Sequence, residues 1–413
     1  MSCCFATIVS ANYIAYAKVL AQSLAEHAPE VAFRVLVVDE PQPQVRAVVE
    51  RSGLQAVYAR DLGLPDFDRL AYKFDLVELN TALKPSFLRR LLDEGFTQAA
   101  YVDPDIRFFG PPTPVLEALE GASVVLTPHT LAPVMDGLRP SDVDFLRNGT
   151  FNLGFVAVRE CPEARALLTW WEERCLGLGF NDPSFGVFVD QKWMDLVPSF
   201  FADHRILRHP GCNAAYWNLH ERTVAMEQGE PRVNGQPLVF FHFSGVDAAR
   251  PEILSRHQTR HQLVPGSPLA LLVAEYCAAL LAAGHAEFRG LAYSYGRLDD
   301  GTPISATMRR ALVLAPEVRA PFAAGSEFQR ELRARGITPS GNTATAPGSS
   351  TLNFDQADRR VRAVNGLLRF ARRLIGVERL RQLLQYAAVL TRESNYASVL
   401  LDRPLDLSHR PKR

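Results

Sequence analysis

Asp103 and Asp105 are two carboxylates one residue apart, and they directly follow the apolar run of residues 98–102. Because residues i and i+2 of an extended chain face the same side, both side chains can point to one place beyond the end of that run. Hard divalent cations such as Mg²⁺ and Mn²⁺ take oxygen ligands of this kind and often share them with the phosphates of a bound nucleotide. Asp-Pro is also a turn signal, so the pair taken alone leaves a turn and a metal clamp both open.

Four polar motifs follow the acidic pair along the chain, each beside an apolar run. They are FNLG at residues 151–154, VDQKW at 189–193, YWN at 216–218 and FHFSG at 241–245. His242 in the last motif offers an imidazole, which suits Mn²⁺ better than Mg²⁺ as a partner of two carboxylates. A core histidine at this position remains the alternative, as does a capping role for Asn152 at a strand end and for Asp190 at a helix start.

In this order the motifs resemble those of the family 8 glycosyltransferases. These are retaining enzymes of the GT-A fold and include glycogenins and bacterial lipopolysaccharide galactosyl- and glucosyltransferases. The resemblance covers roughly residues 5–250, and the whole pattern is also similar to a group of largely uncharacterised bacterial glycosyltransferases. It implies that Mn²⁺, or Mg²⁺, is bound by Asp103, Asp105 and His242.

The resemblance also implies where the donor sugar lies. Asn152 and Gly154 are expected to contact the sugar, and Asp190 and Gln191 are expected to lie under its ring as the catalytic residues. Gln191 is a weak nucleophile that can stabilise an oxocarbenium-like cation, which fits same-face attack with retention. Asp190 as a covalent nucleophile is the alternative.

Further residues are expected at the nucleotide end of the donor. The resemblance implies contacts to the nucleotide from Thr7, Asn12, Tyr13, Lys84 and Gly245. Ser10 stands where the family has an acidic residue that binds uracil, and Ala248 stands where it has a lysine on the diphosphate. Arg250, two residues later, is expected to bind the diphosphate instead, because a guanidinium can bind phosphate through two hydrogen bonds.

The elements that must position these residues alternate in type. Runs rich in β-forming residues at 5–11, 33–39 and 56–62 are separated by helical patterns at 13–27 and 43–53. A helix at 84–96 then leads to the run at 98–102, and further strands are expected at 122–129 and 152–159. This alternation predicts an α/β fold with a mostly parallel sheet flanked by helices. The resemblance implies that this fold is of the GT-A, Rossmann-like type. Ligands of such sheets bind at the carboxyl ends of the strands.

The pattern along the chain predicts four parts. These are a nucleotide-sugar-binding catalytic domain at 1–250, a helical C-terminal extension at 251–335, a flexible linker at 336–352 and a basic amphipathic helical tail at 353–413. The apolar run at 269–284 is too short to span a bilayer and contains Glu275, so it is predicted as a buried helix. Residues 358–390 fit either contact with a membrane or protein partner, or packing back on the same protein.

Composition limits the classes of partner and compartment. Lys plus Arg and Asp plus Glu each number 45 among 413 residues, so no net charge draws the chain to nucleic acid. The six cysteines lack zinc-site spacing and disulfide density, which favours reduced thiols. The first 13 residues do not fit a secretory signal. We therefore expect a cytoplasmic location, with association at the inner face of the membrane as a further option.

Together these features predict a metal-dependent glycosyltransferase, more narrowly a hexosyltransferase. It is expected to transfer a sugar from a nucleotide-diphosphate sugar, with UDP as the expected nucleotide, to a hydroxyl of a glycan or other acceptor in bacterial glycan or polysaccharide synthesis. A sugar nucleotidyltransferase is disfavoured because residues 10–18 contain no glycine. The other alternative is a non-catalytic scaffold that binds metal and carbohydrate and docks through its basic helix. Its sugar-stacking residues would be Trp170, Trp171, Trp193 and Trp217.

Overall fold

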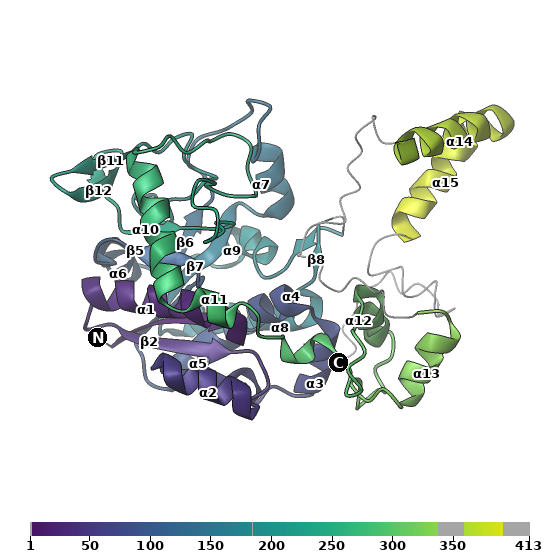
Figure 1. The fold of residues 1–413 in the computed structure, drawn as a ribbon, viewed down its shortest axis with the longest axis horizontal. Helices are drawn as coiled ribbons and strands as arrows, with labels where there is room; N and C mark the ends of the chain where they lie inside the picture. Colours follow the sequence, from purple (N-terminus) through teal and green to yellow (C-terminus); the bar gives the residue numbers. More distant parts are fainter. Residues whose placement is uncertain (1, 184, 338–358, 391–413) are drawn as a thin grey trace. The chain divides into compact units, whose positions relative to one another are not determined.

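The computed structural model describes residues 2–183, 185–337 and 359–390. These form two compact units (Figure 1): one comprises the chain up to Phe67 together with Glu78–Tyr295, and the other comprises Asp68–Val77 and the chain from Gly296 onwards. The linker predicted at 336–352 lies outside the described residues from residue 338 on. Residues 353–358 and 391–413 of the predicted tail also lie outside them.

A seven-stranded sheet forms the centre of the first unit, with the order β10-β6-β7-β4-β1-β2-β3. Its strands are β1 (Cys3–Val9), β2 (Ala32–Val37), β3 (Ala56–Tyr58), β4 (Gln98–Val102), β6 (Val124–Pro128), β7 (Phe151–Arg159) and β10 (His204–Ile206). Four neighbouring pairs are parallel, whereas β7 runs antiparallel to both β4 and β6. The predicted mostly parallel sheet flanked by helices is confirmed.

Helices α1 (Ile14–His27) and α6 (Thr113–Glu120) pack apolar side chains against this sheet. The helices of the unit are α1 (Ile14–His27), α2 (Pro43–Ser52), α5 (Lys84–Asp93), α6 (Thr113–Glu120), α7 (Asp142–Asn148), α8 (Pro162–Leu178), α9 (Val197–Phe200), α10 (Pro268–Ala282) and α11 (His285–Phe288). Leu20 and Leu24 of α1 join Val115 and Leu119 of α6 in one buried cluster with strand residues such as Phe155. Proline in the first turn of α2, α5, α6 and α8 marks where these helices begin.

Short strands and turns carry the chain between distant parts of the unit. Strand β5 (Ile106–Phe108) pairs antiparallel with β14 (Phe240–His242), and β8 (Asn181–Asp182) pairs with β9 (Val187–Phe188). Strands β11 (Val224–Glu227), β12 (Glu230–Val233) and β13 (Gln236–Pro237) form a separate three-stranded sheet. Three short helical turns are η1 (Ala11–Tyr13), η2 (Ala59–Leu62) and η3 (Lys192–Leu196). Of these connections, the β5–β14 pair brings residue 242 next to the turn at residues 103–105.

The second unit is helical and is organised around the buried side chain of Tyr72. Helices α12 (Ala306–Val313) and α13 (Glu327–Ala334) pack on it through an apolar cluster that includes Met308 and Phe328. Arg309 donates hydrogen bonds from Nη1 to the backbone carbonyls of residues 71, 72 and 74, and Gln329 Nε2 donates to the Tyr72 hydroxyl. The predicted helical C-terminal region is confirmed.

The remaining helices complete the description. Helices α3 (Phe67–Lys73) and α4 (Leu76–Ala82) lie where the chain passes between the two units. Helices α14 (Arg359–Ile375) and α15 (Val377–Leu390) follow each other through Gly376, whose φ of 81° permits the sharp change of direction. No described helix is both long enough and apolar enough to cross a membrane.

Candidate metal and ligand site

Asp103, Asp105 and His242 form one group, called here the metal cluster. Asp103 and Asp105 lie in the turn between β4 and β5, and the β5–β14 register sets His242 opposite Ile106. His242 Nε2 lies 2.9 Å from Asp105 Oδ1 and 3.7 Å from Asp103 Oδ2. One nitrogen or oxygen atom from each residue lies within 4.8 Å of the other two. The structure therefore brings together the three residues predicted as metal ligands.

The charges of the metal cluster support one another in the absence of an ion. Burial lowers the pKa of His242, but the Asp105 carboxylate outweighs this effect and the pKa is raised overall. Burial raises the pKa of Asp105, but His242 outweighs it and the pKa is lowered overall. One imidazole nitrogen and two carboxylates are a donor set that suits Mn²⁺, and a cation would replace the shared proton. The residues thus fit the expected metal.

Gly154 lies against the metal cluster, where no larger residue fits. The β4–β7 register pairs Val102 with Phe155, and Asp103 N donates a 2.7 Å hydrogen bond to Gly154 O. A Cβ at position 154 would lie 2.3 Å from His242 Cε1 and 2.7 Å from Asp103 Oδ2. Both distances are well inside van der Waals contact. The glycine is required here by the closeness of the β7 backbone to the ligands.

Lys84 is buried beside the metal cluster although it is the first residue of α5. Its Nζ lies 3.0 Å from Asp190 Oδ2 and 3.6 Å from Asp103 Oδ1, and it donates a 2.8 Å hydrogen bond to Leu153 O. The ring of Tyr101 lies under the ammonium at 4.3 Å, and the Tyr101 hydroxyl donates to Asp103 Oδ1 at 2.6 Å. Lys84 thereby connects the metal cluster to Asp190.

Burial governs the charge of the Lys84–Asp190 pair. Burial raises the pKa of Asp190 to about 6, and Lys84 opposes this rise. Burial lowers the pKa of Lys84, but Asp103 and Asp190 outweigh it, so its pKa is raised overall. The ammonium therefore stays protonated and holds both carboxylates. Removing either partner would leave a buried charge without compensation.

Gln191 and Asp190 are predicted catalytic residues that follow β9 in a strained turn. Val189 has a φ of 42°, a left-handed conformation that a β-branched residue rarely adopts. Gln191 Oε1 accepts a hydrogen bond from Leu153 N, and its Nε2 donates to Asn148 O, both at 3.0 Å. The orientation of the Gln191 amide is therefore determined by the backbone. Strained backbone of this kind often accompanies functional sites.

Asn152 is held by two residues that sequence reasoning did not single out. Its Oδ1 accepts a 3.0 Å hydrogen bond from Asn213 Nδ2, which also donates to Thr127 Oγ1 at 2.8 Å. On the other side, Asn152 Nδ2 lies 3.4 Å from His129 Nε2. Asn213 is fully buried and has a φ of 54°. Asparagine tolerates that conformation better than most residues, which was the one signal in the sequence for its role.

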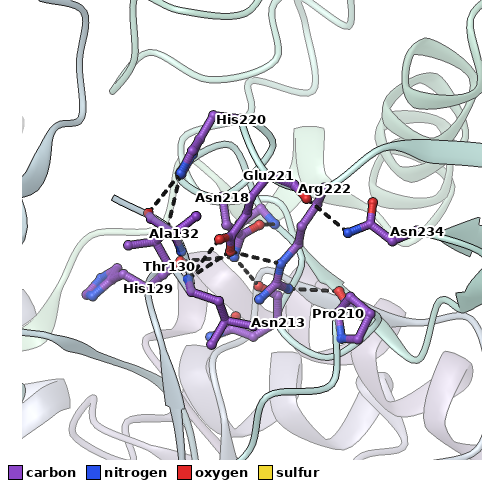
Figure 2. A network of polar contacts seen from close by, with 12 residues as sticks. His129, Thr130, Ala132, Pro210, Asn213, Asn218, His220, Glu221, Arg222 and Asn234 are labelled. Carbon is purple, nitrogen blue, oxygen red and sulfur yellow. Dashed lines mark hydrogen bonds and ion pairs between the residues drawn. The ribbon is translucent and has the colours of Figure 1, made fainter. Parts of the chain in front are cut away.

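A polar network fixes the loop that carries His129 (Figure 2). Asn218 Nδ2 donates to the backbone carbonyls of His129 and Asn213, at 3.1 and 3.0 Å. The Glu221 carboxylate accepts from the backbone N–H of residue 131, and Arg222 Nη1 donates to the carbonyls of residues 210 and 212. These hydrogen bonds join the segments 129–132 and 210–222, so the residues that contact Asn152 are held in place.

The tryptophans do not support a surface for stacking on sugars. Trp171 is fully buried and Trp217 is 3% exposed. Trp217 meets the ring of His242 edge-on at 5.0 Å and that of His129 at 5.5 Å. Trp170 packs against the rings of Phe200 and Phe201. Trp217 therefore supports the imidazole of the metal cluster, and the scaffold alternative is not favoured.

The residues predicted to bind the nucleotide follow β1. Thr7 is fully buried in that strand, and Ser10 Oγ donates to Asn12 Oδ1 in the turn after it. The ring of Tyr13 is 38% exposed and stacks on Tyr16 with 4.6 Å between centroids. Tyr13 thus offers a free aromatic face at the carboxyl end of β1, where ligands of such sheets bind.

Gly245 and the basic residues after it lie in the segment that follows β14. Arg250 is exposed and forms an ion pair with Asp247 at 3.1 Å. Gly245 has a φ of 77°, and a Cβ there would lie 2.5 Å from His257 Cδ2. Arg256 N donates to Gly245 O at 3.2 Å, and Arg256 Nε donates to His257 Nε2 at 3.3 Å. His257, which is itself exposed, thus packs on the glycine of the FHFSG motif.

The chain matches no protein family model. Two proteins of Bacillus subtilis strain 168 are similar to it, both uncharacterised. YfnF is 27% identical over 271 residues, which is 64% of this chain and 89% of YfnF. YfnD is 26% identical over 245 residues, which is 58% of this chain and 77% of YfnD. Because both relatives are uncharacterised, the similarity to them assigns no activity to this chain.

Solved structures with a similar arrangement include three glycosyltransferases. The galactosyltransferase LgtC, in complex with donor and acceptor sugar analogs, has a TM-score of 0.38 at 15% identity, over 67% of this chain and 95% of LgtC. Mouse xyloside xylosyltransferase 1 has a TM-score of 0.37 at 14% identity, over 59% and 97%. GlyE of Streptococcus pneumoniae TIGR4 has a TM-score of 0.37 at 13% identity, over 70% and 64%. These TM-scores and identities are too low to support a function for this chain. Any functional proposal depends instead on the strand order and the geometry of the site.

Proposed function

We propose that this protein is a glycosyltransferase that moves a sugar from a nucleotide-diphosphate sugar to an acceptor hydroxyl. The observation that carries the proposal is the convergence of Asp103, Asp105 and His242 beside the buried Lys84–Asp190 pair. Such a site combines a place for a divalent cation with a place for a sugar ring. The acceptor is proposed to be a glycan or another hydroxyl compound in bacterial glycan or polysaccharide synthesis.

Asp103, Asp105 and His242 would hold Mn²⁺, with Mg²⁺ as the second choice. When bound, the cation supplies positive charge that stabilises the departing diphosphate. The side chains around it keep the ligands in place: the Tyr101 hydroxyl and Lys84 act on Asp103, and Trp217 acts on His242. UDP is the proposed nucleotide, with the exposed face of Tyr13 available to its base.

On the sugar side, Gln191 is proposed to stabilise positive charge at the anomeric carbon. Its amide is oriented by the backbone of Leu153 and Asn148, and an amide oxygen is a weak nucleophile. Asp190 is 1% exposed and bound to Lys84, so it is less available for covalent attack. This arrangement supports same-face attack with retention. Mass spectrometry of enzyme stopped during turnover tests it: a sugar ester on Asp190 would show the covalent route instead.

Arg256 is proposed to contact the diphosphate in place of Arg250. Arg256 is exposed, and the described residues supply no carboxylate within ion-pair distance, whereas Asp247 already engages Arg250. The charges of both Asp105 and Arg256 act on the pKa of Tyr13, although burial is the largest cause of its rise. Arg256 N donates a hydrogen bond to the carbonyl of Gly245, three residues after His242, which supports a role for Arg256 beside the metal cluster.

Paired substitutions test this assignment. Arg256→Gln should raise the KM for the donor by about 10-fold or more, because a charge-assisted bond to phosphate contributes roughly 1.5–3 kcal/mol. Arg250→Gln is the matched control and should change the KM by less than about twofold, because its partner is exposed. The opposite order of effects would return the role to Arg250.

A thermal-shift panel of nucleotide sugars with and without Mn²⁺ tests the proposed function itself. A ligand that binds only the native state raises its stability by mass action. We expect the largest shift from one nucleotide sugar together with Mn²⁺. Asp103→Asn and Asp105→Asn should lose that shift and the Mn²⁺-dependent hydrolysis of the donor, whereas the exposed control Asp61→Asn should keep both. Full donor hydrolysis by the wild type in EDTA would contradict the metal assignment.

A further inference from the structure

Helices α14 and α15 expose a row of large apolar side chains. On α14, Val364, Leu367, Phe370 and Leu374 are 55%, 69%, 59% and 69% exposed. Their spacing of three or four residues sets them on one face of the helix. On α15, four further apolar side chains are 44–60% exposed, namely Val377, Leu383, Leu384 and Tyr386. A contiguous row of exposed apolar side chains is typical of a surface that binds a protein, a ligand or a membrane.

The same helices carry strong positive charge. Residues 359–375 contain six arginines and no aspartate or glutamate. Of these arginines, Arg362, Arg369, Arg372 and Arg373 have described side chains, and none pairs with a carboxylate of a described residue. On α15, Arg381 forms an exposed ion pair with Glu378. The charge of these four arginines is thus uncompensated within the described part of the chain.

The combination of exposed apolar side chains and unpaired arginines indicates which kind of partner fits this surface. Nucleic acid would neutralise the arginines but offers no hydrocarbon to cover Leu367 or Phe370. An anionic lipid surface offers both, because its headgroups are negative and its acyl chains lie just below them. A helix of 17 residues with six arginines cannot cross the bilayer, so it would lie in the plane of the interface.

We propose that α14 and α15 dock on an anionic membrane surface, with the apolar row in the acyl boundary and the arginines at the headgroups. This goes beyond the proposed sugar transfer and does not depend on it. It would bring the protein to the surface where amphiphilic acceptors are found. The sequence alone also allowed packing on the same protein, and the arginine-rich polar side of α14, which negative headgroups would neutralise, is what favours the membrane.

Flotation of the full-length protein with lipid vesicles tests this proposal. We expect binding to phosphatidylcholine vesicles that contain roughly one third phosphatidylglycerol at low salt, and little binding to pure phosphatidylcholine. High salt should release the protein because it screens the headgroup charge. Replacing Arg369, Arg372 and Arg373 with Gln should weaken partitioning by roughly 100-fold, at about fivefold for each arginine.

Two further variants separate the contributions. Leu367→Gln with Leu374→Gln keeps all charge but removes apolar contact, and should weaken partitioning by at least roughly 10-fold. A matched control replaces Arg46, Arg51 and Arg60 of the first unit with Gln, which removes the same charge and should leave vesicle binding within about twofold. Circular dichroism verifies that each variant keeps its helices.

Three results would overturn the proposal. They are no binding of the wild type to anionic vesicles at low salt, equal binding of the three-arginine variant, and equal loss in the matched control. Saturable binding to an acidic protein without vesicle binding would assign the surface to a protein partner instead. Donor hydrolysis measured without vesicles should be unchanged in all helix variants, so failure here is distinguishable from failure of the proposed transferase activity.

Discussion

Replacing Gly154 with alanine should push His242 and Asp103 of the metal cluster apart while leaving the central sheet in place. The added Cβ would lie 2.3 Å from His242 Cε1, 2.8 Å from His242 Nδ1 and 2.7 Å from Asp103 Oδ2. To restore an ordinary van der Waals distance, the His242 imidazole must move away from the added Cβ by about 1 Å. Metal ligands tolerate deviations of only about 0.2 Å. The retreat is therefore several times larger than the metal site allows.

Two measurements report this displacement. Titration of Mn²⁺, followed by the paramagnetic resonance of the free ion, should show an affinity roughly 10- to 100-fold lower than that of the wild type. Urea unfolding without metal should show a loss of about 1–3 kcal/mol, the usual cost of overpacking a dense interior.

Gly177→Ala in α8 is the matched control. Nothing lies within 4 Å of a Cβ at that position, so alanine should keep Mn²⁺ affinity unchanged. It should also stabilise the helix by about 0.5–1 kcal/mol. Wild-type Mn²⁺ affinity in Gly154→Ala would refute the reasoning, since it would mean that His242 is not a ligand or that β7 lies further from it.

Three further predictions concern the stability of the site. Burial lowers the pKa of His129 to about 4, so its neutral state stabilises the fold fully above the unfolded pKa near 6.5. About 3 kcal/mol is lost as the pH falls from 6.5 to 4. Because the raised pKa of Asp190 acts in the opposite direction over part of this range, the difference in urea unfolding between the wild type and His129→Gln should show the loss. Lys84→Met should cost about 3–5 kcal/mol by leaving Asp190 as an unpaired buried charge, and adding Asp190→Asn should recover part of this in a double-mutant cycle. Asn213→Ala should cost roughly 2–4 kcal/mol in chemical denaturation, because it removes two hydrogen bonds and strains a left-handed residue, whereas Asn213→Gly should cost measurably less; equal costs would rule out the backbone contribution.

The amino-acid sequence by itself determined the local elements and the chemistry of the ligands. The apolar run predicted at 98–102 is β4, and the helical pattern at 43–53 contains α2 at Pro43–Ser52. These elements follow from side-chain periodicity, which depends on residues close together in the chain. The acidic pair and His242 were identifiable as candidate ligands because their types and the motifs beside them restrict the chemistry, and the structure brings them together.

Only the tertiary structure decided which distant residues meet. The antiparallel register of β7 sets Gly154 against Asp103, and the burial of Lys84 makes it a partner of Asp190 instead of an exposed helix start. Asp247 engages Arg250 and leaves the neighbourhood of Gly245 to Arg256. The physical reason is that such contacts depend on strand register and loop closure over long separations. Local patterns in a single sequence carry little information about either.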